Sequence, residues 1–392
     1  MLPDDAIPQP AVEVSARGIT NTVRDSLRDI AAEHPRLKRT LRSAEQGLGL
    51  IEHTAGSIVP SLIRPRPRRM TVAVTAYCNL RCIGCRYGRD FMVGHQLSLS
   101  EVCSLLDEAK QAGVEMVRFY GGEPLLHPNL PEMVRHAVGI GLSTYITTNG
   151  ILLRQKIDTL FDAGLRDITL GYYGAGDAYD RYVQRSDRFD RVIEGLEYAR
   201  ARYGEALSMQ LNYLIMRPSC TIEAFEKAWS IVKRFGMTLH TDLIHYSLPY
   251  FTDGQEGDLQ LGPEDESAIR SLVAELSRLK REYPTQVRES LASIHSIPDW
   301  LLKGADMRVP CDVRNLLWVG ADGTVQLCYV TFRLGNIRER RLSEMLFTAK
   351  HREAAKNAFL LNCPNCHCER DGRIQKHLPS RLRYAVLPPA SS

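Results

Sequence analysis

The chain has 392 residues, of which 44% are hydrophobic and 24% are charged. This composition is typical of a globular protein of two or three domains. It excludes global disorder, a collagen-like repeat and a miniprotein held together by disulfides. Fifty Lys and Arg residues against 46 Asp and Glu residues leave a formal net charge of +4. Such a small balance gives no sign of an obligatory polyanionic partner.

The sequence shows no membrane or export signal. No stretch is long and apolar enough to span a membrane, and the segment MLPDDAIPQP lacks the charged and then apolar pattern of a signal peptide. We therefore expect a cytoplasmic protein. Because the cytosol keeps thiols reduced, the ten cysteines predict metal binding or catalysis rather than structural disulfides.

Residues 1–69 form the first predicted region, an N-terminal tail followed by a helical extension. Residues 1–15 are rich in Pro and Asp, and the apolar spacing over 23–50 predicts one or two amphipathic helices interrupted near Pro35. The stretch 63–69, rich in Pro and Arg, marks a boundary, and its arginines are interpreted as a solvated linker.

Residues 70–300 form the second region, in which strand-like runs alternate with helical patterns. Strands are predicted at 70–76, 115–120, 142–148, 167–172, 208–216 and 238–246. Helices are predicted near 100–112, 129–139, 153–163, 189–203, 221–235 and 263–282. This order predicts an α/β fold with parallel strands, a partial (β/α)6 barrel whose functional site lies at the C-terminal ends of its strands.

A small C-terminal domain is predicted over 301–370, after a change of composition near 298–310. It contains a β-hairpin formed by 316–319 and 324–329, a helix near 342–358 and a Cys-rich loop at 363–368. Residues 371–392 are expected to be a tail.

Three cysteines directly follow the first strand of the repeating region, in the order Cys78-Asn-Leu-Arg-Cys82-Ile-Gly-Cys85. Soft thiolates this close together suit an iron–sulfur cluster. Three protein ligands leave one iron of a cubane open to a small molecule. The alternative is a structural zinc site completed by a residue such as His95.

A second motif, Gly121-Gly122-Glu123-Pro124, ends the second predicted strand. Glycines without side chains let a ligand approach the main chain closely, and Glu123 offers an acceptor to a cationic amine. Alone, this motif is equally a loop between a strand and a helix. Together with the cysteines, however, it lies at the same predicted edge of the barrel.

On these residues the chain resembles the radical S-adenosylmethionine (SAM) enzymes over roughly 70–250. The resemblance implies that Cys78, Cys82 and Cys85 hold a 4Fe–4S cluster whose open iron chelates SAM, and that Gly121, Gly122, Glu123 and Pro124 secure the methionyl amino group. It also implies that an electron from the cluster cleaves SAM to methionine and a 5′-deoxyadenosyl radical, which abstracts a substrate hydrogen.

Other positions fit this resemblance more loosely. Thr148 and Asn149 end the third strand where this family places polar SAM contacts, and Arg185 resembles an arginine that meets the SAM carboxylate. The residue before the third cysteine is usually aromatic in the family, but here it is Gly84. We expect Tyr87 to replace that contact with adenine.

A second cysteine group comprises Cys311, Cys328, Cys363, Cys366 and Cys368. Four thiolates form a cage for an iron–sulfur cluster, and structural zinc is again the alternative. The spacing resembles the C-terminal SPASM and twitch domains of radical SAM proteins. This resemblance implies one auxiliary 4Fe–4S cluster held by Cys311, Cys328, Cys363 and Cys366, with Cys368 either replacing Cys366 or remaining free.

Three residues near strand ends are candidates for catalysis. Cys220 follows the fifth strand, where a thiol would return hydrogen to a substrate radical, although a cysteine at a helix start is more often a packing residue. His245 and Tyr246 end the sixth strand and are candidates for substrate binding or proton transfer. His240 and Asp242, earlier in that strand, are expected to be packed and hydrogen-bonded.

The leading hypothesis is a radical SAM oxidoreductase or isomerase that acts on a small polar substrate. Twitch-type relatives suggest a sugar, aminocyclitol or nucleoside-like molecule and an outcome of dehydrogenation or epimerisation. The expected partners are this substrate and an electron donor such as flavodoxin or ferredoxin, with no membrane and no nucleic acid. The alternatives are a radical SAM maturase of ribosomally made peptides and a non-catalytic zinc protein.

Overall fold

The computed structural model describes residues 35–245, 257–329 and 331–386. The first described helix is α2 (Pro35–Ile58). Pro35, near which the sequence predicts an interruption, is the first residue of this helix, where proline is tolerated. The part of that prediction before Pro35 lies outside the described residues.

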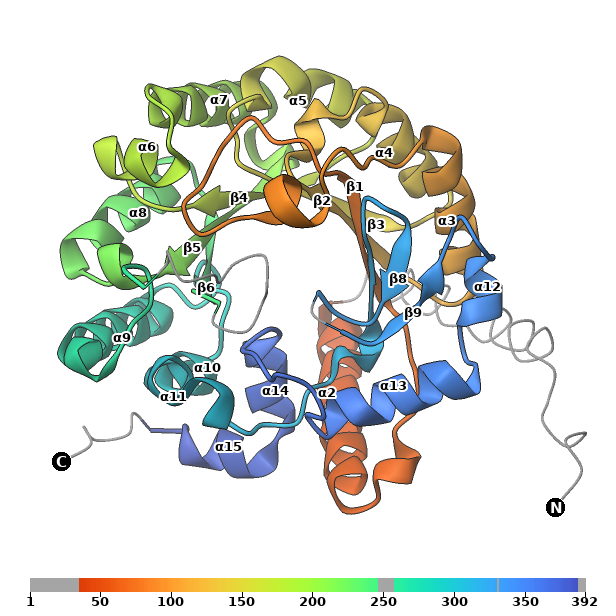
Figure 1. Cartoon of the computed structure of the whole chain (residues 1–392). Helices are drawn as coiled ribbons and strands as arrows, with labels where there is room; N and C mark the ends of the chain where they lie inside the picture. The colour runs from red at the N-terminus through yellow and green to blue at the C-terminus, as the bar shows by residue number, and fades with distance from the viewer. Residues whose placement is uncertain (1–34, 246–256, 330, 387–392) are drawn as a thin grey trace, which may run out of the picture.

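Six strands alternate with helices over the predicted barrel region (Figure 1). The strands are β1 (Arg69–Thr75), β2 (Met116–Gly121), β3 (Ser143–Thr148), β4 (Asp167–Tyr172), β5 (Ser208–Ile215) and β6 (Thr238–Leu243). The helices are α3 (Leu99–Gln111), α4 (Leu130–Gly139), α5 (Leu153–Asp162), α6 (Asp177–Val183), α7 (Arg188–Tyr203), α8 (Ile222–Arg234) and α9 (Glu266–Glu282). All six strands pair in parallel and in sequence order, which confirms the predicted α/β fold with an open barrel.

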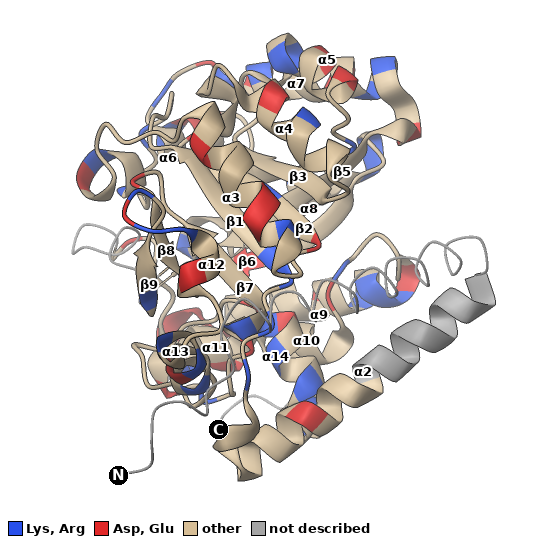
Figure 2. Cartoon of the chain, turned by 90° about the vertical axis from the view of Figure 1, so that its right-hand side faces the viewer, with Lys and Arg blue, Asp and Glu red and all other residues tan. Residues whose placement is uncertain are grey.

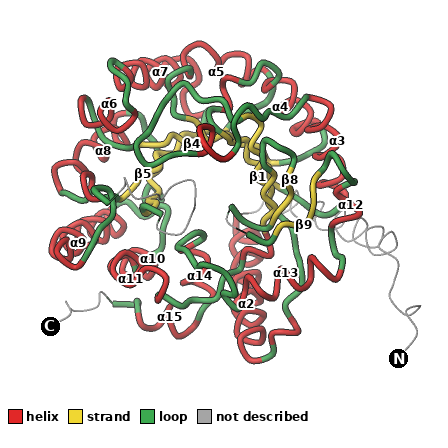
Figure 3. The backbone as a smooth tube through the Cα atoms, viewed as in Figure 1, coloured by secondary structure: helices red, strands yellow, loops and turns green. Residues whose placement is uncertain are grey.

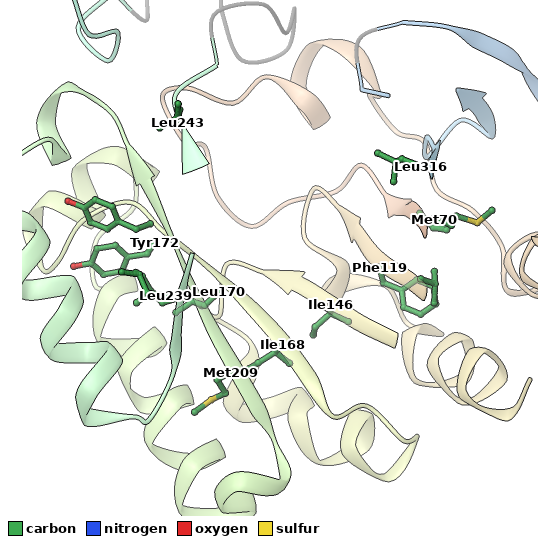
Figure 4. Packing of buried hydrophobic residues seen from close by; sticks show 14 of the residues in the cluster. Met70, Phe119, Ile146, Ile168, Leu170, Tyr172, Met209, Leu239, Leu243 and Leu316 are labelled. Atoms are coloured by element: carbon green, nitrogen blue, oxygen red, sulfur yellow. The ribbon is translucent and has the colours of Figure 1, made fainter. Parts of the chain in front are cut away.

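Local sequence signals explain these boundaries. Ser98 begins α3 with a capping box, in which its hydroxyl accepts from the Glu101 amide while the Glu101 carboxylate accepts from the Ser98 amide. Alternate strand residues are buried against the outer helices. Figure 4 shows Ile146, Ile168 and Met209 pointing from the sheet toward these helices.

The C-terminal strands extend the same sheet, which the sequence does not predict. β7 (Leu316–Val319) pairs in parallel with β1, and β8 (Thr324–Gln326) and β9 (Arg333–Asn336) follow as antiparallel strands. In the described residues the sheet therefore has nine strands in the order β6-β5-β4-β3-β2-β1-β7-β8-β9. The predicted hairpin is present as β7 and β8, and it forms one wall of the barrel.

Helices bridge the side that the sheet leaves open, between β6 and the C-terminal strands (Figure 3). They are α10 (Leu291–His295), α11 (Ile297–Lys303), α13 (Ala349–Phe359), α14 (Arg370–Lys376) and α15 (Leu378–Arg383), whereas α12 (Leu342–Met345) lies beside α3 (Figure 3). The helix predicted near 342–358 is broken at Phe347, which has a φ of 58°, and Thr348 caps α13. The expected tail after residue 370 instead contains α14 and α15, because Arg373, Ile374 and Tyr384 pack in the interior.

Charged residues of both signs are interspersed along the helices of the side shown in Figure 2. Within the part of the chain that the structure describes, no helix is long and apolar enough to cross a membrane.

Candidate active site

The first three cysteines lie in the loop that follows β1. The Cys78 thiol accepts from the Leu80 amide at 3.4 Å, and the Cys85 amide donates to the Cys82 carbonyl at 3.2 Å. Two further main-chain hydrogen bonds hold the loop against α6: Arg81 donates to Val183 at 3.1 Å and Ile83 to Tyr182 at 2.9 Å. Burial raises the pKa of Cys78 to about 12 and holds the pKa of Cys82 well above its ordinary value.

The two glycines of the Gly-Gly-Glu-Pro turn serve a close main-chain contact. Gly121 has a φ of 140°, and a β-carbon there would lie 2.2 Å from the Thr75 carbonyl oxygen; at Gly122 it would lie 2.4 Å from that of Tyr77. The Gly122 and Glu123 amides donate to these two carbonyls at 2.8 Å. The glycines therefore let β2 approach the segment leading to Cys78, and the expectation that they also admit a ligand stays a prediction.

Glu123 is 1% exposed, and both its oxygens accept hydrogen bonds from the protein. Oε1 accepts from the Thr148 hydroxyl at 2.7 Å and the Leu125 amide at 3.0 Å, and Oε2 accepts from the Asn149 amide at 2.8 Å. Burial raises the pKa of Glu123 to about 7, against the effect of these donors. The geometry makes Glu123 a positioning residue that joins the ends of β2 and β3. A carboxylate has about four acceptor sites, so its predicted contact with an amine stays a prediction.

Asn149 extends this network to the cysteine loop. Its side-chain amide donates to Oδ1 of Asn79 at 2.8 Å, and Asn79 directly follows Cys78. Glu123, Thr148, Asn149 and Asn79 therefore tie together the ends of the first three strands. Pro124 begins the buried turn that follows Glu123.

Tyr87 does not occupy the place that Gly84 leaves. Its ring is 3% exposed and packs edge-on against Trp318 of β7, with ring centroids 6.4 Å apart. A β-carbon on Gly84 would instead lie 3.1 Å from the Tyr182 hydroxyl, and Tyr173 stacks on Tyr182 at 4.8 Å. The aromatic group next to Gly84 therefore comes from α6, which the sequence does not reveal.

Two other predicted residues lie away from these contacts. Arg185 is exposed, and its guanidinium donates to the neighbouring Gln184 carbonyl at 2.9 Å. Cys220 is 1% exposed in the hydrophobic core, where burial raises its pKa to about 12. This placement favours the packing interpretation of Cys220. Tyr246 lies outside the described residues.

One cavity brings together all five C-terminal cysteines. It is lined by Cys311, Cys328, Cys363, Cys366 and Cys368. The cavity also touches Arg69 and Met116, at the starts of β1 and β2, and Arg118 and Tyr329 farther along. The auxiliary cysteines therefore face the barrel wall, and the donor set suits an iron–sulfur cluster.

The arrangement of the cysteines bears on the zinc alternative. Among the described residues, no three His, Cys, Asp or Glu side chains are grouped so that they could hold a single metal ion. Zinc requires such convergence, because its thiolates all lie about 2.3 Å from one atom. A cubane iron–sulfur cluster does not require its cysteines to converge on one atom, because each cysteine binds a different iron. His95, the suggested fourth zinc ligand, is exposed.

The face of the sheet opposite the outer helices, which we call the lumen, carries polar side chains of β2, β5 and β6. They include Arg118, Tyr120, Asn212, His240 and Asp242. The Arg118 guanidinium donates to the Tyr329 hydroxyl at 3.1 Å and lies over the Tyr120 ring at 4.4 Å. Asn212 donates to Oδ2 of Asp242 at 2.7 Å. Sequence reasoning missed Arg118 and Asn212, although their alternation with buried residues placed them on the inner face.

His240 joins the lumen to a buried charged group. Its Nδ1 lies 3.0 Å from Oε1 of Glu289, and its Nε2 lies 3.7 Å from Oδ1 of Asp242. Burial opposes a charge on the ring, but Glu289 and Asp242 outweigh it and raise the pKa of His240 to about 10. The charged imidazole in turn holds the pKa of Asp242 well below its usual range, against the effect of burial.

Replacing His240 with Gln should destabilise the protein most at low pH. The pKa of His240 rises from an ordinary 6.5 to about 10 on folding, so its stabilisation is complete below 6.5 and is lost as the pH rises through 10. The difference in thermal unfolding temperature between wild type and variant should therefore shrink from about pH 6 to about pH 10. A difference that does not change with pH would contradict this charge assignment.

His245 connects the lumen to the auxiliary cysteines. Its Nε2 lies 3.9 Å from the Cys368 sulfur, and its ring stacks on His367 at 4.3 Å. Burial lowers the pKa of His245 to about 4, so its imidazole is neutral at pH 7. The structure thus brings together His245 and Cys368, which sequence reasoning treated separately.

Comparisons with known proteins agree with this geometry. The model of the radical SAM superfamily matches residues 72–244, and that of the SPASM iron–sulfur cluster-binding domain matches 311–368. The GTP 3′,8-cyclase of Chlorobaculum tepidum is 40% identical over 152 residues, which are 37% of this chain and 44% of that protein. The AdoMet-dependent heme synthase of Methanosarcina barkeri is 28% identical over 173 residues, which are 43% of this chain and 48% of that protein. The chain thus spans about half the length of the curated relatives it matches.

Two solved structures share the fold. The enzyme anSMEcpe with bound AdoMet and a Cp18Cys peptide has a TM-score of 0.58 and 18% identity, over 81% of this chain and 95% of that one. Streptococcus suis SuiB, bound to its precursor peptide SuiA, has a TM-score of 0.56 and 16% identity, over 80% and 70%. With both domain models matched in the order that the fold displays, the chain contains a radical SAM domain over residues 72–244 and a SPASM iron–sulfur cluster-binding domain over residues 311–368.

Proposed function

We propose that this enzyme removes a hydrogen atom from a small polar molecule bound in the lumen, and that the outcome is dehydrogenation. Cys78, Cys82 and Cys85 would hold the cluster that, when bound, supplies the electron for SAM cleavage. The auxiliary cysteines would hold a second cluster able to accept the remaining electron from the substrate radical, which thereby becomes the oxidised product.

The observation that carries this proposal is a pair of buried polar atoms on the inner face of the sheet. Arg118 Nε and Asn212 Oδ1 are both buried, and neither has a hydrogen-bond partner among the described residues. Leaving a buried donor or acceptor unpaired costs about 1–3 kcal/mol, so such atoms indicate a polar ligand. A substrate with both acceptor and donor groups would satisfy them.

The surrounding charges define the substrate further. Asp242 has an ionised carboxylate whose side chain is 51% exposed, and the charge of Asp242 acts on Arg118. An anionic or carbonyl group of the substrate would contact Arg118, and a hydroxyl or amine would contact Asp242. The relatives named GTP 3′,8-cyclase act on a nucleotide, which is consistent with a molecule of this kind.

His245 is the proposed base for a substrate hydroxyl. Its Nε2 would take the hydroxyl proton as the carbon bearing that hydroxyl becomes a carbonyl carbon. Cys220, the thiol that would return a hydrogen atom in an epimerisation, is buried in the core, and this supports dehydrogenation as the proposed outcome.

Modification of a ribosomally made peptide is the second candidate. It is favoured by the two solved structures of this fold that hold peptides, although their low identity shows the fold alone. In this alternative the lumen would receive one peptide side chain, and the rest of the peptide would lie outside the barrel.

An assay of 5′-deoxyadenosine separates the two candidates. The reconstituted enzyme, SAM and dithionite are incubated with nucleotides, sugar phosphates and aminocyclitols, or with peptides encoded beside this protein. We expect a small molecule to stimulate 5′-deoxyadenosine formation and to appear as its oxidised product. Asp242→Asn should reduce that stimulation, whereas Asp162→Asn, on the exposed end of α5, should not. Stimulation by peptides alone would refute the proposal.

A further inference from the structure

Arg373 on α14 is a buried arginine at the auxiliary cysteines. Arg373 is 1% exposed, and its guanidinium carbon lies 4.6 Å from the centroid of the Trp300 ring. Nε donates to the Val309 carbonyl at 3.1 Å, and Nη2 donates to the same carbonyl and to Oδ1 of Asn365 at 3.2 Å. Nη1 donates to the Cys366 carbonyl. Arg373 therefore joins the segment that precedes Cys311 to the loop of Cys363 and Cys366.

Among the described side chains, no carboxylate pairs with the charge of Arg373. Within the described ranges, no Asp or Glu oxygen lies within the 4.0 Å ion-pair distance of its guanidinium. Two other arginines near these cysteines differ in this respect. Arg69 pairs with Glu369 at 2.6 Å, and Arg314 pairs with Asp312 at 2.7 Å. Because a buried charge without a counter-charge is costly, the site of Arg373 calls for an anion.

The thiols of the loop that Arg373 contacts are able to supply that anion. Nη1 donates to the main chain of Cys366, Nη2 donates to Asn365 between Cys363 and Cys366, and the charge of Arg373 acts on Cys311, Cys363 and Cys366. All guanidinium donors point to main-chain carbonyls or to Asn365, so Arg373 would act on these sulfurs through its charge and not through hydrogen bonds.

We propose that Arg373 is the built-in counter-charge of the auxiliary cluster and raises the reduction potential of that cluster. One-electron reduction adds a negative charge to a thiolate-bound cluster, and a nearby fixed cation stabilises the reduced form more than the oxidised form. A higher potential makes the cluster a better acceptor. The inference rests on the assignment of these cysteines to the cluster and is independent of the substrate.

The test measures the auxiliary cluster alone. In the full chain carrying Cys78→Ala/Cys82→Ala/Cys85→Ala, the remaining cluster is titrated electrochemically and its reduced form is followed by electron paramagnetic resonance. We compare Arg373→Gln, Arg373→Lys and the double variant Arg69→Gln/Glu369→Gln. The double variant removes one positive and one negative charge from the lining of the same cavity.

We expect Arg373→Gln to lower the potential, and Arg373→Lys and the double variant to stay near the parent value. If Arg373→Gln loses its iron while Arg373→Lys keeps it at the parent potential, the counter-charge is likewise supported. An unchanged potential in Arg373→Gln would overturn the proposal. So would an equal fall in Arg373→Lys, or loss of iron from both, because either result would assign Arg373 a role through its hydrogen bonds alone. None of these readouts requires SAM or substrate.

Discussion

Replacing Cys78, Cys82 and Cys85 together with alanine should remove about four of about eight iron atoms per reconstituted chain. It should also reduce SAM cleavage to the background rate. The three thiols lie in one loop after β1, while the other five cysteines named as ligands line a separate cavity, so the auxiliary cluster should remain. The measurements are iron and sulfide content, followed by 5′-deoxyadenosine formation with dithionite.

The control for this variant is Cys103→Ala, which removes a half-buried thiol of α3 that lies outside both groups. We expect its iron content and SAM cleavage to match those of the wild type. Full iron content in the triple variant would show that the loop holds no cluster. Zinc in place of iron in the wild type would instead support the alternative of a structural zinc site.

Replacing Glu123 with alanine should destabilise the chain and weaken SAM binding. The change leaves the Thr148 hydroxyl and the Asn149 and Leu125 amides without their acceptor at a buried position. At about 1–3 kcal/mol for each orphaned group, the free energy of unfolding should fall by roughly 3 kcal/mol or more. Glu123→Gln keeps the shape of the side chain, but its amide NH2 faces one of these hydrogen-bond donors. Its free energy of unfolding should therefore fall by about 1–2 kcal/mol.

Urea unfolding of the cluster-free protein checks the stability, and SAM titration of the reconstituted enzyme checks the affinity. Glu132→Ala, on the exposed side of α4, should stay within about 0.5 kcal/mol of the wild type. If Glu123→Ala binds SAM as tightly as the wild type and unfolds at the same urea concentration, the network does not position the site as we describe.

Much of the barrel follows from local sequence patterns. The predicted strand 167–172 coincides with β4. Both ends of β2, β3 and β5 lie within one residue of their predicted bounds. Each strand is a short β-rich run between turn residues, so its signal is local. By contrast, the pairing of β7 with β1 joins segments more than 200 residues apart, and no local pattern specifies it.

The site was predictable as a set of residues but not as a set of contacts. The cysteine and Gly-Gly-Glu-Pro motifs identify the chemistry, yet the role of the glycines depends on how close the Thr75 and Tyr77 carbonyls lie. Tyr87 was misassigned because its ring turns toward Trp318, a residue of the C-terminal wall. Arg373 lies in what the sequence suggested was a tail, and only the tertiary fold brings it to the auxiliary cysteines.

The central claim is that the loop after β1 holds a cluster with an iron open to SAM. Electron paramagnetic resonance of the dithionite-reduced protein, recorded with and without SAM, tests it without any knowledge of the substrate. We predict two cluster signals, one of which changes when SAM is added and is missing from the Cys78→Ala/Cys82→Ala/Cys85→Ala variant. Spectra with and without SAM that coincide, in a protein with its full iron content, would contradict the account.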